Sequence, residues 1–436
     1  MISETRRRDI ISALRRGTVP NAGLDALAVG LGVLAPVFET ELESVATGGA
    51  GFKAVRGEYG SGKTFFGRWL QERARSRGFA TSEVQINESE TPLHRLETVY
   101  RRLVERLATT DTPSGAFRSI VDGWFYALEQ DAEAEAVDEA LDEAAVVERA
   151  NELMEARLAT VSRTAPAFAA VLRAYRAALA AQEHAVAEGL ISWLAGQPNV
   201  SASIKRAAGI KGDLDHFGAT NFLAGLLVML RDSGFPGLVL ILDEVETLQR
   251  MRADTREKGL NALRQWIDEI DAGRYPGLYL VVTGTPAFFD GPQGVQRLPP
   301  LAQRLHVDFS ADARFDNPRA VQVRLQAFDE GSLVEVGRRV RNLFATGTEN
   351  RERIEERVSD GYVERLAQTV TGKLGGKVGV APRLFLKKLV ADVLDRVDLH
   401  AEFDPSQHYA LTVVDADMTL HERAAAKALS VDDIEL

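Results

Sequence analysis

An eight-residue glycine-rich segment constrains this chain more than any other part of the sequence. It reads Gly57-Glu58-Tyr59-Gly60-Ser61-Gly62-Lys63-Thr64 and matches the pattern G-x-x-x-x-G-K-[ST] in full. Residues 52–56 before it favour a strand, and residues 64–77 after it carry apolar residues at helical spacing. A glycine-rich turn at the start of a helix presents backbone N–H groups and the positive end of the helix dipole to an anion. The segment therefore predicts a phosphate-binding loop (P-loop) that holds ATP.

Two side chains of this loop are expected to act directly on the nucleotide. Lys63 would bring positive charge to the β- and γ-phosphates, and Thr64 would offer its hydroxyl to Mg²⁺. Residues 57–62 would supply the backbone cradle around the phosphates. ATP and Mg²⁺ are therefore the expected cofactors.

An acidic pair follows a buried-strand pattern much later in the chain. Residues 238–242 are all apolar and are followed directly by Asp243 and Glu244. An apolar strand that ends in Asp-Glu is the expected partner of a P-loop. We predict that Asp243 holds Mg²⁺, directly or through a water, and that Glu244 polarises the attacking water. Glu246, two residues further on, receives no role from the sequence.

Polar residues at the ends of two other predicted strands are candidates for the same site. Thr283 and Thr285 follow the apolar run 278–282, and either could contact the γ-phosphate or the lytic water. Asn87 follows the alternating run 81–86 and could hold Glu244 away from the water until a ligand binds. The alternative for all three is an ordinary turn residue.

Three arginines could stabilise negative charge in the transition state. Arg304 comes after the threonine-ended strand, and we expect it near the far edge of the module, where it could reach the nucleotide of a neighbouring subunit. Arg297 is a second candidate for that role. Arg383, in the sequence Gly379-Val380-Ala381-Pro382-Arg383, opens a helix and could fold back over the phosphates of its own subunit. The alternative is that each is a surface arginine.

The order of these patterns predicts an α/β fold. Strand patterns alternate with helical patterns in two blocks, which favours a parallel sheet with helices on both faces. Between the blocks lies a long segment rich in alanine and acidic residues, without a strand pattern. We interpret it as a helical insertion whose acids form a solvated face and whose role is protein contact.

The predicted organisation has six parts. They are an N-terminal helical segment (1–45), the first part of the ATPase core (46–110), the insertion (111–212), the second part of the core (213–310), a helical lid (311–400) and a C-terminal tail (401–436).

Composition excludes several other classes of protein. The chain has 436 residues and no cysteine, so disulfides, thiolate zinc sites and a cysteine nucleophile are excluded. Its net charge of −11 disfavours a protein that binds nucleic acid over its whole surface, although a local basic patch is compatible with it. Neither a secretory signal nor a membrane-spanning run is evident, and we expect a cytoplasmic location.

The order of the motifs resembles AAA+ ATPases, with the initiator and helicase-loader branch as the best match. The resemblance covers roughly residues 46–108 and 213–400. It implies that Arg383, at the end of Gly-x-Pro-Arg, is the sensor 2 arginine of that branch, and that the protein forms ATP-dependent homo-oligomers. The insertion departs from the compact core of the family and leaves the geometry of assembly open.

A narrower resemblance is to the ATP-binding proteins of bacteriophage exclusion (BREX) systems, the BrxD-like family. The segments that carry it are residues 8–20, Arg56 to Thr64, and Leu242 to Glu246. It implies a role in antiphage defence beside a helicase or another DNA-processing partner, with DNA as a possible ligand.

Two other functions remain open from the sequence. The chain could be a nucleotide-gated switch with slow turnover, as in STAND-type regulators, with residues 111–212 as its sensor. A metabolic kinase would need a substrate pocket with its own base, and no such group of residues is evident.

Overall fold

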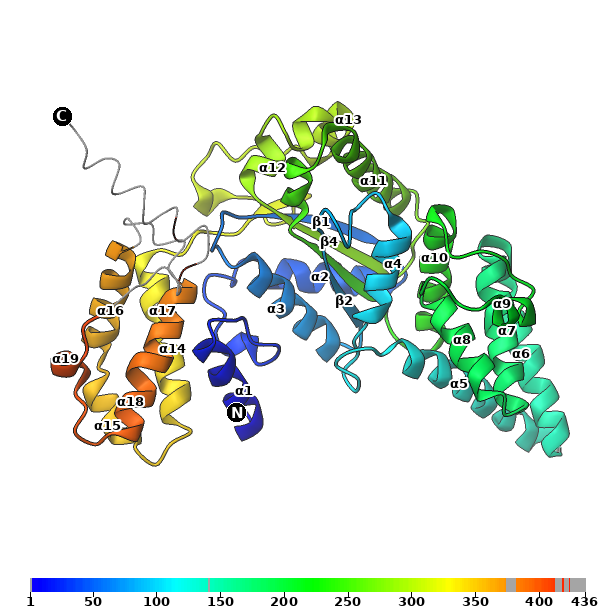
Figure 1. Cartoon of the computed structure of the whole chain (residues 1–436), viewed down its shortest axis with the longest axis horizontal. Coiled ribbons are helices and arrows are strands. Elements are labelled where there is room, and N and C mark those ends of the chain that lie inside the picture. Colours follow the sequence, from blue (N-terminus) through cyan, green and yellow to red (C-terminus); the bar gives the residue numbers. More distant parts are fainter. Residues whose placement is uncertain (1, 140–141, 374–381, 412–417, 419–422, 424–436) are drawn as a thin grey trace.

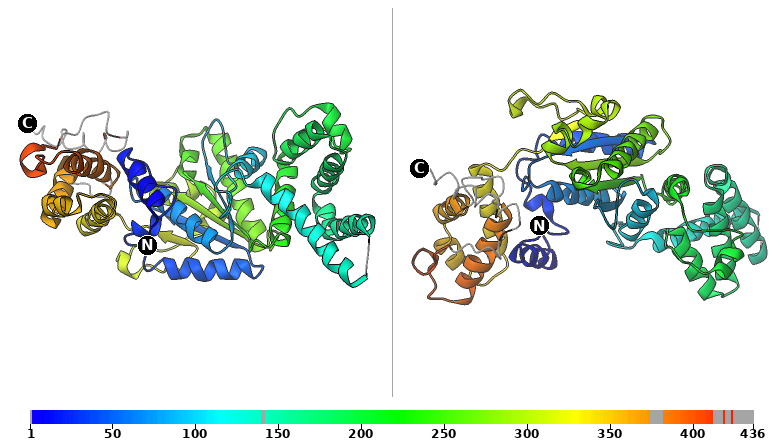
Figure 2. Two further views of the ribbon diagram at one scale, coloured as in Figure 1. Left: turned by 90° about the horizontal axis from the view of Figure 1, so that it is seen from below. Right: turned by 45° about the horizontal axis from the view of Figure 1, so that its top comes forward.

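The computed structural model describes residues 2–139, 142–373 and 382–411, together with residues 418 and 423. Helices cover both faces of a central five-stranded sheet, and two further groups of helices lie at its opposite ends (Figure 1, Figure 2). The strand order is β2-β3-β4-β1-β5. The strands are β1 (Gly51–Arg56), β2 (Ala80–Gln85), β3 (Leu238–Asp243), β4 (Leu278–Gly284) and β5 (Gln322–Arg324).

Every pair of neighbouring strands in this sheet is parallel. The carboxyl ends of the strands therefore share one edge, where Arg56 lies opposite Gly284 and Gln85 lies opposite Asp243. Strands β3 and β4 are buried along their whole length, as expected when both faces of a parallel sheet are covered. The α/β fold class predicted from the sequence is confirmed.

The two faces of the sheet pack against different helices. One face is covered by α2 (Ala35–Ala46) and α3 (Lys63–Ser76), and the other by α4 (Leu96–Glu105), α10 (His216–Asp232), α11 (Ala253–Asp271), α12 (Pro286–Asp290) and α13 (Pro299–Leu305). Val55 and Val281 belong to the first cluster, whereas Ala54 and Val282 belong to the second. Successive residues of a strand point to opposite faces of the sheet, so a continuous apolar run places apolar side chains on both faces.

The segment predicted as an insertion forms a helical bundle at one end of the sheet (Figure 1). Its helices are α5 (Phe117–Glu139), α6 (Glu143–Thr164), α7 (Pro166–Ala180), α8 (His184–Leu194) and α9 (Ala202–Ala207). Phe222 of α10 packs the bundle against the core. Its ring contacts Phe168 and Trp193 edge-on, at centroid distances of 5.2 and 5.4 Å. Among the described residues, no helix is long and apolar enough to cross a membrane.

Part of the acidic run in this bundle pairs with arginines of the bundle itself. Glu129 and Asp131 of α5 form ion pairs with Arg176 and Arg157, which lie on α7 and α6. These acids therefore link the bundle helices to one another at its surface.

The C-terminal helices form a separate apolar cluster at the other end of the sheet. They are α14 (Glu330–Ala345), α15 (Arg351–Arg357), α16 (Asp360–Lys373), α17 (Pro382–Lys388), a π-helical turn (Leu389–Leu394), α18 (Asp395–Leu399) and α19 (Pro405–His408). The N-terminal helix α1 (Glu4–Arg15) joins this lid rather than the core, because Ile10, Ile11 and Leu14 are buried in the same cluster. Arg15 also donates two hydrogen bonds to Asp395, at 2.6 and 2.7 Å.

The segment between α1 and α2, residues 17–34, connects the lid to the core. The backbone N–H groups of Gly23 and Leu24 donate to Glu72 of α3 at 2.6 and 2.7 Å. On the lid side, Arg339 of α14 donates to the carbonyl oxygen of Ala28 at 2.6 Å. The segment is thus fixed to both parts.

The extent of the sheet differs from the sequence-based expectation. Strand β5 pairs with β1 although it follows residue 310, so the sheet extends beyond the range expected for the core. In the lid, α15 ends at Arg357 and α16 begins at Asp360. After β3, a 3-10 turn (Val245–Arg250) precedes α11, which begins at Ala253.

The packing of α1 on the lid predicts a specific loss of stability. Ile10 is 0% exposed, so Ile10→Ala should lower the free energy of unfolding by about 2–5 kcal/mol through lost burial and a cavity. Urea denaturation followed by circular dichroism measures this change. Leu399→Ala is the control, because Leu399 is 74% exposed and should change stability by less than about 0.5 kcal/mol. Equal effects of the two substitutions would contradict the assignment of α1 to the lid.

Candidate functional site

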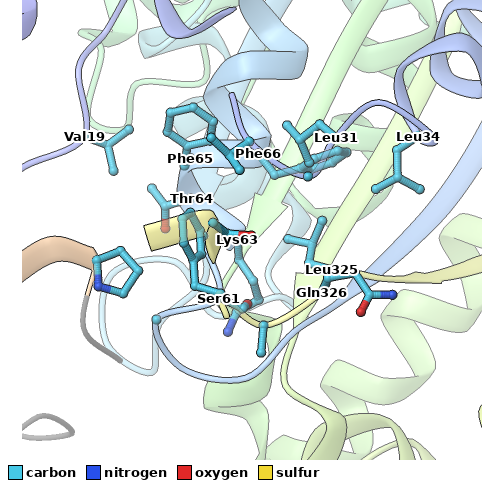
Figure 3. Close-up of a pocket in the computed structure, with 18 of the residues that line it drawn as sticks. Val19, Leu31, Leu34, Ser61, Lys63, Thr64, Phe65, Phe66, Leu325 and Gln326 are labelled. Carbon is cyan, nitrogen blue, oxygen red and sulfur yellow. The ribbon is translucent and has the colours of Figure 1, made fainter. Parts of the chain in front are cut away.

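A cavity of about 650 Å³ lies where the core, the lid and residues 17–34 meet. Its wall contains the end of the P-loop and the acidic residues that follow β3. The lid contributes Pro382, Arg383 and Leu386, and residues 313–328 close another side. Figure 3 shows apolar side chains such as Val19, Phe65 and Leu31 beside Ser61, Lys63 and Thr64. The cavity therefore joins an apolar wall to a polar floor.

The glycines of the P-loop are required by its backbone conformation. Gly60 and Gly62 have φ angles of 83° and 90°, in the region where a β-carbon is disfavoured. At Gly57 a β-carbon would lie 2.2 Å from Ser61 Oγ, so a larger residue there would force the Ser61 side chain to move. The hydroxyl of Ser61 is buried and lacks a hydrogen-bond partner among the described residues. An unpaired buried hydroxyl inside a tight loop fits a site that receives a polar ligand.

Lys63 begins α3 and turns its ammonium back into the loop. Its Nζ donates to the carbonyl oxygens of Gly57 and Glu58, at 2.9 and 3.3 Å. It also lies 3.6 Å from Glu246 Oε1 and 5.0 Å from the centre of the Tyr59 ring. Burial is the main cause of a raised pKa of Tyr59, whose hydroxyl accepts a 3.3 Å hydrogen bond from Arg250.

Asp243 connects the P-loop helix to β4. Thr64 Oγ1 donates to one oxygen of Asp243 at 3.0 Å, and the buried Thr283 hydroxyl donates to the other. Oxygen ligands of this kind suit Mg²⁺, which binds one or two protein oxygens and completes its shell with waters and phosphates. No group of three or more His, Cys, Asp or Glu side chains that could hold a metal ion occurs in the described ranges. The residues present therefore fit a phosphate-bound Mg²⁺.

Glu244 adopts a left-handed backbone conformation with φ of 60°. Its N–H donates to Asp243 Oδ1 at 3.0 Å, and its carboxylate accepts a 2.9 Å hydrogen bond from the Gln85 side chain. Asn87, proposed from the sequence for this contact, instead accepts from the backbone N–H groups of Glu90 and Thr91, at 2.6 and 3.1 Å. The residue that contacts Glu244 is Gln85, because β2 ends there and Asn87 lies in the following turn.

Glu246 is a site residue to which the sequence analysis gave no role. It follows the left-handed Glu244, lines the cavity and is only 4% exposed. Burial raises the pKa of its carboxyl group, and the nearby Lys63 partly offsets this effect. One of its oxygens is buried without a hydrogen-bond partner among the described residues.

The other predicted residues divide into those near the cavity and those away from it. Arg383 lines the cavity and approaches Gly17, where an added β-carbon would lie 3.0 Å from its guanidinium. The preceding residues 379–381 lie outside the described part of the chain. Thr285 is buried as the residue before α12.

Arg304 and Arg297 do not line the cavity. Arg304 forms ion pairs with Asp268 and Asp271 of α11, at 2.6 and 3.2 Å, and Arg297 is exposed. Neither arginine is brought to the P-loop of its own chain.

Two further arginines near the cavity were not considered from the sequence. Arg314 lines the cavity and pairs with Asp312 at 2.7 Å. Arg324 of β5 donates two 2.8 Å hydrogen bonds to Asp316, which fixes the segment before β5. No sequence motif indicated either residue, because the segment that contains them, residues 313–328, has no regular pattern of apolar residues.

The contact between Gln85 and Glu244 predicts a change in activity if it restrains the carboxylate. Gln85→Ala should free Glu244 and raise basal nucleotide hydrolysis about twofold to tenfold, since one hydrogen bond to a charged group is lost. Steady-state phosphate release measures the rate. Asn87→Ala is the matched control and should leave the rate unchanged, because Asn87 contacts backbone groups of its own turn. A lower rate in Gln85→Ala would contradict a restraining role.

Comparison with known proteins gives a family match and distant structural similarities. Residues 2–413 match the family described as BREX system ATP-binding protein BrxC/D. No curated protein matches the chain. Among solved structures, the ORC2 protein of Aeropyrum pernix, solved as ADPNP–ADP complexes, is 12% identical. That match covers 87% of this chain and 70% of the other, at a TM-score of 0.34.

The family match extends over nearly the whole chain, including the P-loop, the acidic pair after β3 and the lid. It confirms the resemblance drawn from the sequence. The chain belongs to the family of BREX system ATP-binding proteins BrxC/D.

Proposed function

We propose that this protein is a Mg²⁺-dependent AAA+ ATPase that works in a BREX-type antiphage defence system. The observation that carries the proposal is the 3.0 Å hydrogen bond from Thr64 to Asp243, made at the start of the helix that also carries Lys63. This contact joins the P-loop to the acidic strand end, which is the arrangement that phosphoryl-transfer sites need. The family name, an ATP-binding protein of BREX systems, supports the same ligand.

The shape of the cavity supports binding of ATP. Its volume of about 650 Å³ lies within the usual range for small-molecule sites. The triphosphate would lie on the P-loop amides, and the base would lie against apolar side chains from residues 17–34 and α3, such as Val19 and Phe65. Arg383 would approach the phosphates from the lid.

When bound, Mg²⁺ would neutralise charge on the β- and γ-phosphates. Thr64 and Asp243 would hold it, and Thr283 would orient the Asp243 carboxylate through its buried hydrogen bond. Lys63 would donate to phosphate oxygens once it leaves the carbonyls of its own loop.

Glu244 would position and polarise the water that attacks the γ-phosphate. Its carboxylate must first leave Gln85, which holds it in the arrangement observed here. Arg304 would act only from a neighbouring copy, after release from Asp268 and Asp271, so we propose that hydrolysis depends on a homo-oligomer.

The energy of hydrolysis would be passed to a partner through the lid. Residues 17–34 contact both α3 and α14, so a nucleotide in the cavity would contact the core and the lid at once. A change in bound nucleotide could then move the lid and α1 relative to the sheet. We propose that this movement acts on DNA or loads and regulates a helicase or another protein of the defence system.

A second candidate is a nucleotide-gated switch with slow turnover. It is favoured because Glu244 and Lys63, the two side chains proposed to act in hydrolysis, both contact other side chains. Gln85 donates a hydrogen bond to Glu244, and Glu246 lies beside Lys63. In this case assembly, rather than continuous hydrolysis, would be the output.

Substitution of the two charged site residues tests the ATPase directly. Lys63→Ala should reduce ATP binding and lower turnover at least about 100-fold, because a charged phosphate donor is lost. Glu244→Gln should retain ATP binding and lower turnover by about 100-fold or more, because the carboxylate can no longer polarise water. Calorimetry and phosphate release separate the two effects. Normal turnover in Glu244→Gln protein would contradict its role.

DNA and assembly separate the two candidate functions. The motor or loader function predicts that single- or double-stranded DNA raises the ATPase rate and that ATP raises the measured mass to that of an oligomer. The switch function predicts a slow ATPase rate that DNA does not change. It also predicts that the measured mass of the assembly depends on which nucleotide is bound. Phosphate release with each DNA, run beside mass photometry with and without ATP, gives both readouts.

A further inference from the structure

The buried carboxylate of Glu246 has no direct role in the proposed hydrolysis of ATP. It lies in the cavity wall, two residues after the acidic pair, and is 4% exposed. Burying a carboxylate is costly unless a cation or hydrogen-bond donors compensate it. The cation that forms an ion pair with Glu246 is Lys63, whose Nζ lies 3.6 Å from Oε1. The two charges therefore depend on each other.

The ammonium of Lys63 has several protein neighbours in the arrangement observed here. An ammonium has three N–H donors. Two of them meet the carbonyl oxygens of Gly57 and Glu58, and the carboxylate of Glu246 lies at ion-pair distance, 3.6 Å away. The Tyr59 ring covers the same ammonium at 5.0 Å. A phosphate that approaches Lys63 therefore meets an ammonium whose charge is already shared with Glu246.

The 3-10 turn Val245–Arg250 holds the loop at two points. Glu246 faces Lys63, and Arg250, at the other end of the turn, donates to the Tyr59 hydroxyl at 3.3 Å. The left-handed backbone of Glu244 starts this turn and separates the water-activating carboxylate from Glu246. A two-residue step thus gives the two carboxylates different neighbours, Gln85 for one and Lys63 for the other.

We propose that Glu246 is a positioning residue that competes with the nucleotide's β- and γ-phosphates for the ammonium of Lys63. This inference rests on the proposed function, since it requires that a polyphosphate binds the P-loop. Binding must draw Lys63 away from Glu246 and leave a buried carboxylate without its cation. Glu246 therefore weakens the affinity for nucleotides that reach Lys63, and favours release of the product diphosphate.

A purely structural role for Glu246 makes a different prediction. If the carboxylate only supported the turn, its replacement would loosen the site and weaken every ligand alike. If the carboxylate competes for Lys63, its replacement by the isosteric amide increases the affinity only for ligands that carry a β-phosphate. The comparison of ADP with AMP therefore separates the two roles.

Calorimetric titration of Glu246→Gln and Glu246→Ala with ADP, a non-hydrolysable ATP analogue and AMP tests the proposal. We expect the Kd for ADP and for the analogue to fall about fivefold in both variants, with no change for AMP. The same substitution in a Lys63→Ala background should leave the Kd for ADP unchanged, because the competing ammonium is gone. Thermal melting without ligand checks that each variant is folded.

Glu88→Gln is the matched control, because Glu88 carries the same charge, is exposed in the turn after β2 and does not line the cavity. It should leave every Kd unchanged. A wild-type Kd for ADP in both folded Glu246 variants would overturn the proposal. An equal change in the Kd for AMP would also overturn it. A tighter Kd for ADP that persists in the Lys63→Ala background would overturn it as well. Failure of the wild-type protein to bind ADP and the analogue would instead overturn the proposed function.

Discussion

The parallel pairing of β1, β3 and β4 is the constraint on which the site depends. Because all strands run the same way, their carboxyl ends meet at one edge, and the polar residues that follow each strand converge there. The hydrogen bonds of Thr64 and Thr283 to Asp243 cross this edge and join three segments that are far apart in the sequence. A single buried carboxylate thus sets the relative position of the P-loop, the acidic pair and the end of β4.

Residues 17–34 give the site a wall that is bonded to both the core and the lid. A sheet edge alone would leave the nucleotide open on one side, but here a segment from before the P-loop closes the cavity and is bound to both α3 and the lid. The apolar residues of α1 are buried with the lid helices, so that α1 and the lid form one body. We infer that any change in how the lid meets the cavity is transmitted to the N-terminus as well.

The sequence predicted those parts of the structure that depend on local pattern. The glycine motif lies between a strand and a helix, as predicted. Asp243 and Thr283 lie at the carboxyl ends of their strands, where the sequence placed them, because continuous apolar runs are typical of strands buried on both faces. The sequence assigned Asn87 rather than Gln85 because the pattern extended the strand to residue 86, whereas β2 ends at Gln85 and Asn87 lies in the following turn. Glu246 and the cavity-lining residues 17–34 could not be predicted, since a left-handed residue and a long-range connection leave no periodic signal. The phosphate-binding, metal-binding and catalytic roles of all the predicted site residues, Arg304 and Arg383 included, stay predictions.

The central claim is that a triphosphate binds the amides around Lys63 with its magnesium facing Asp243. A crystal structure of the protein with Mg²⁺ and a non-hydrolysable ATP analogue tests it most directly. The account predicts phosphates inside the loop 57–64, with Mg²⁺ between them and the oxygens of Thr64 and Asp243. Density for the analogue elsewhere, or a loop that stays filled by its own side chains at saturating ligand, would contradict it.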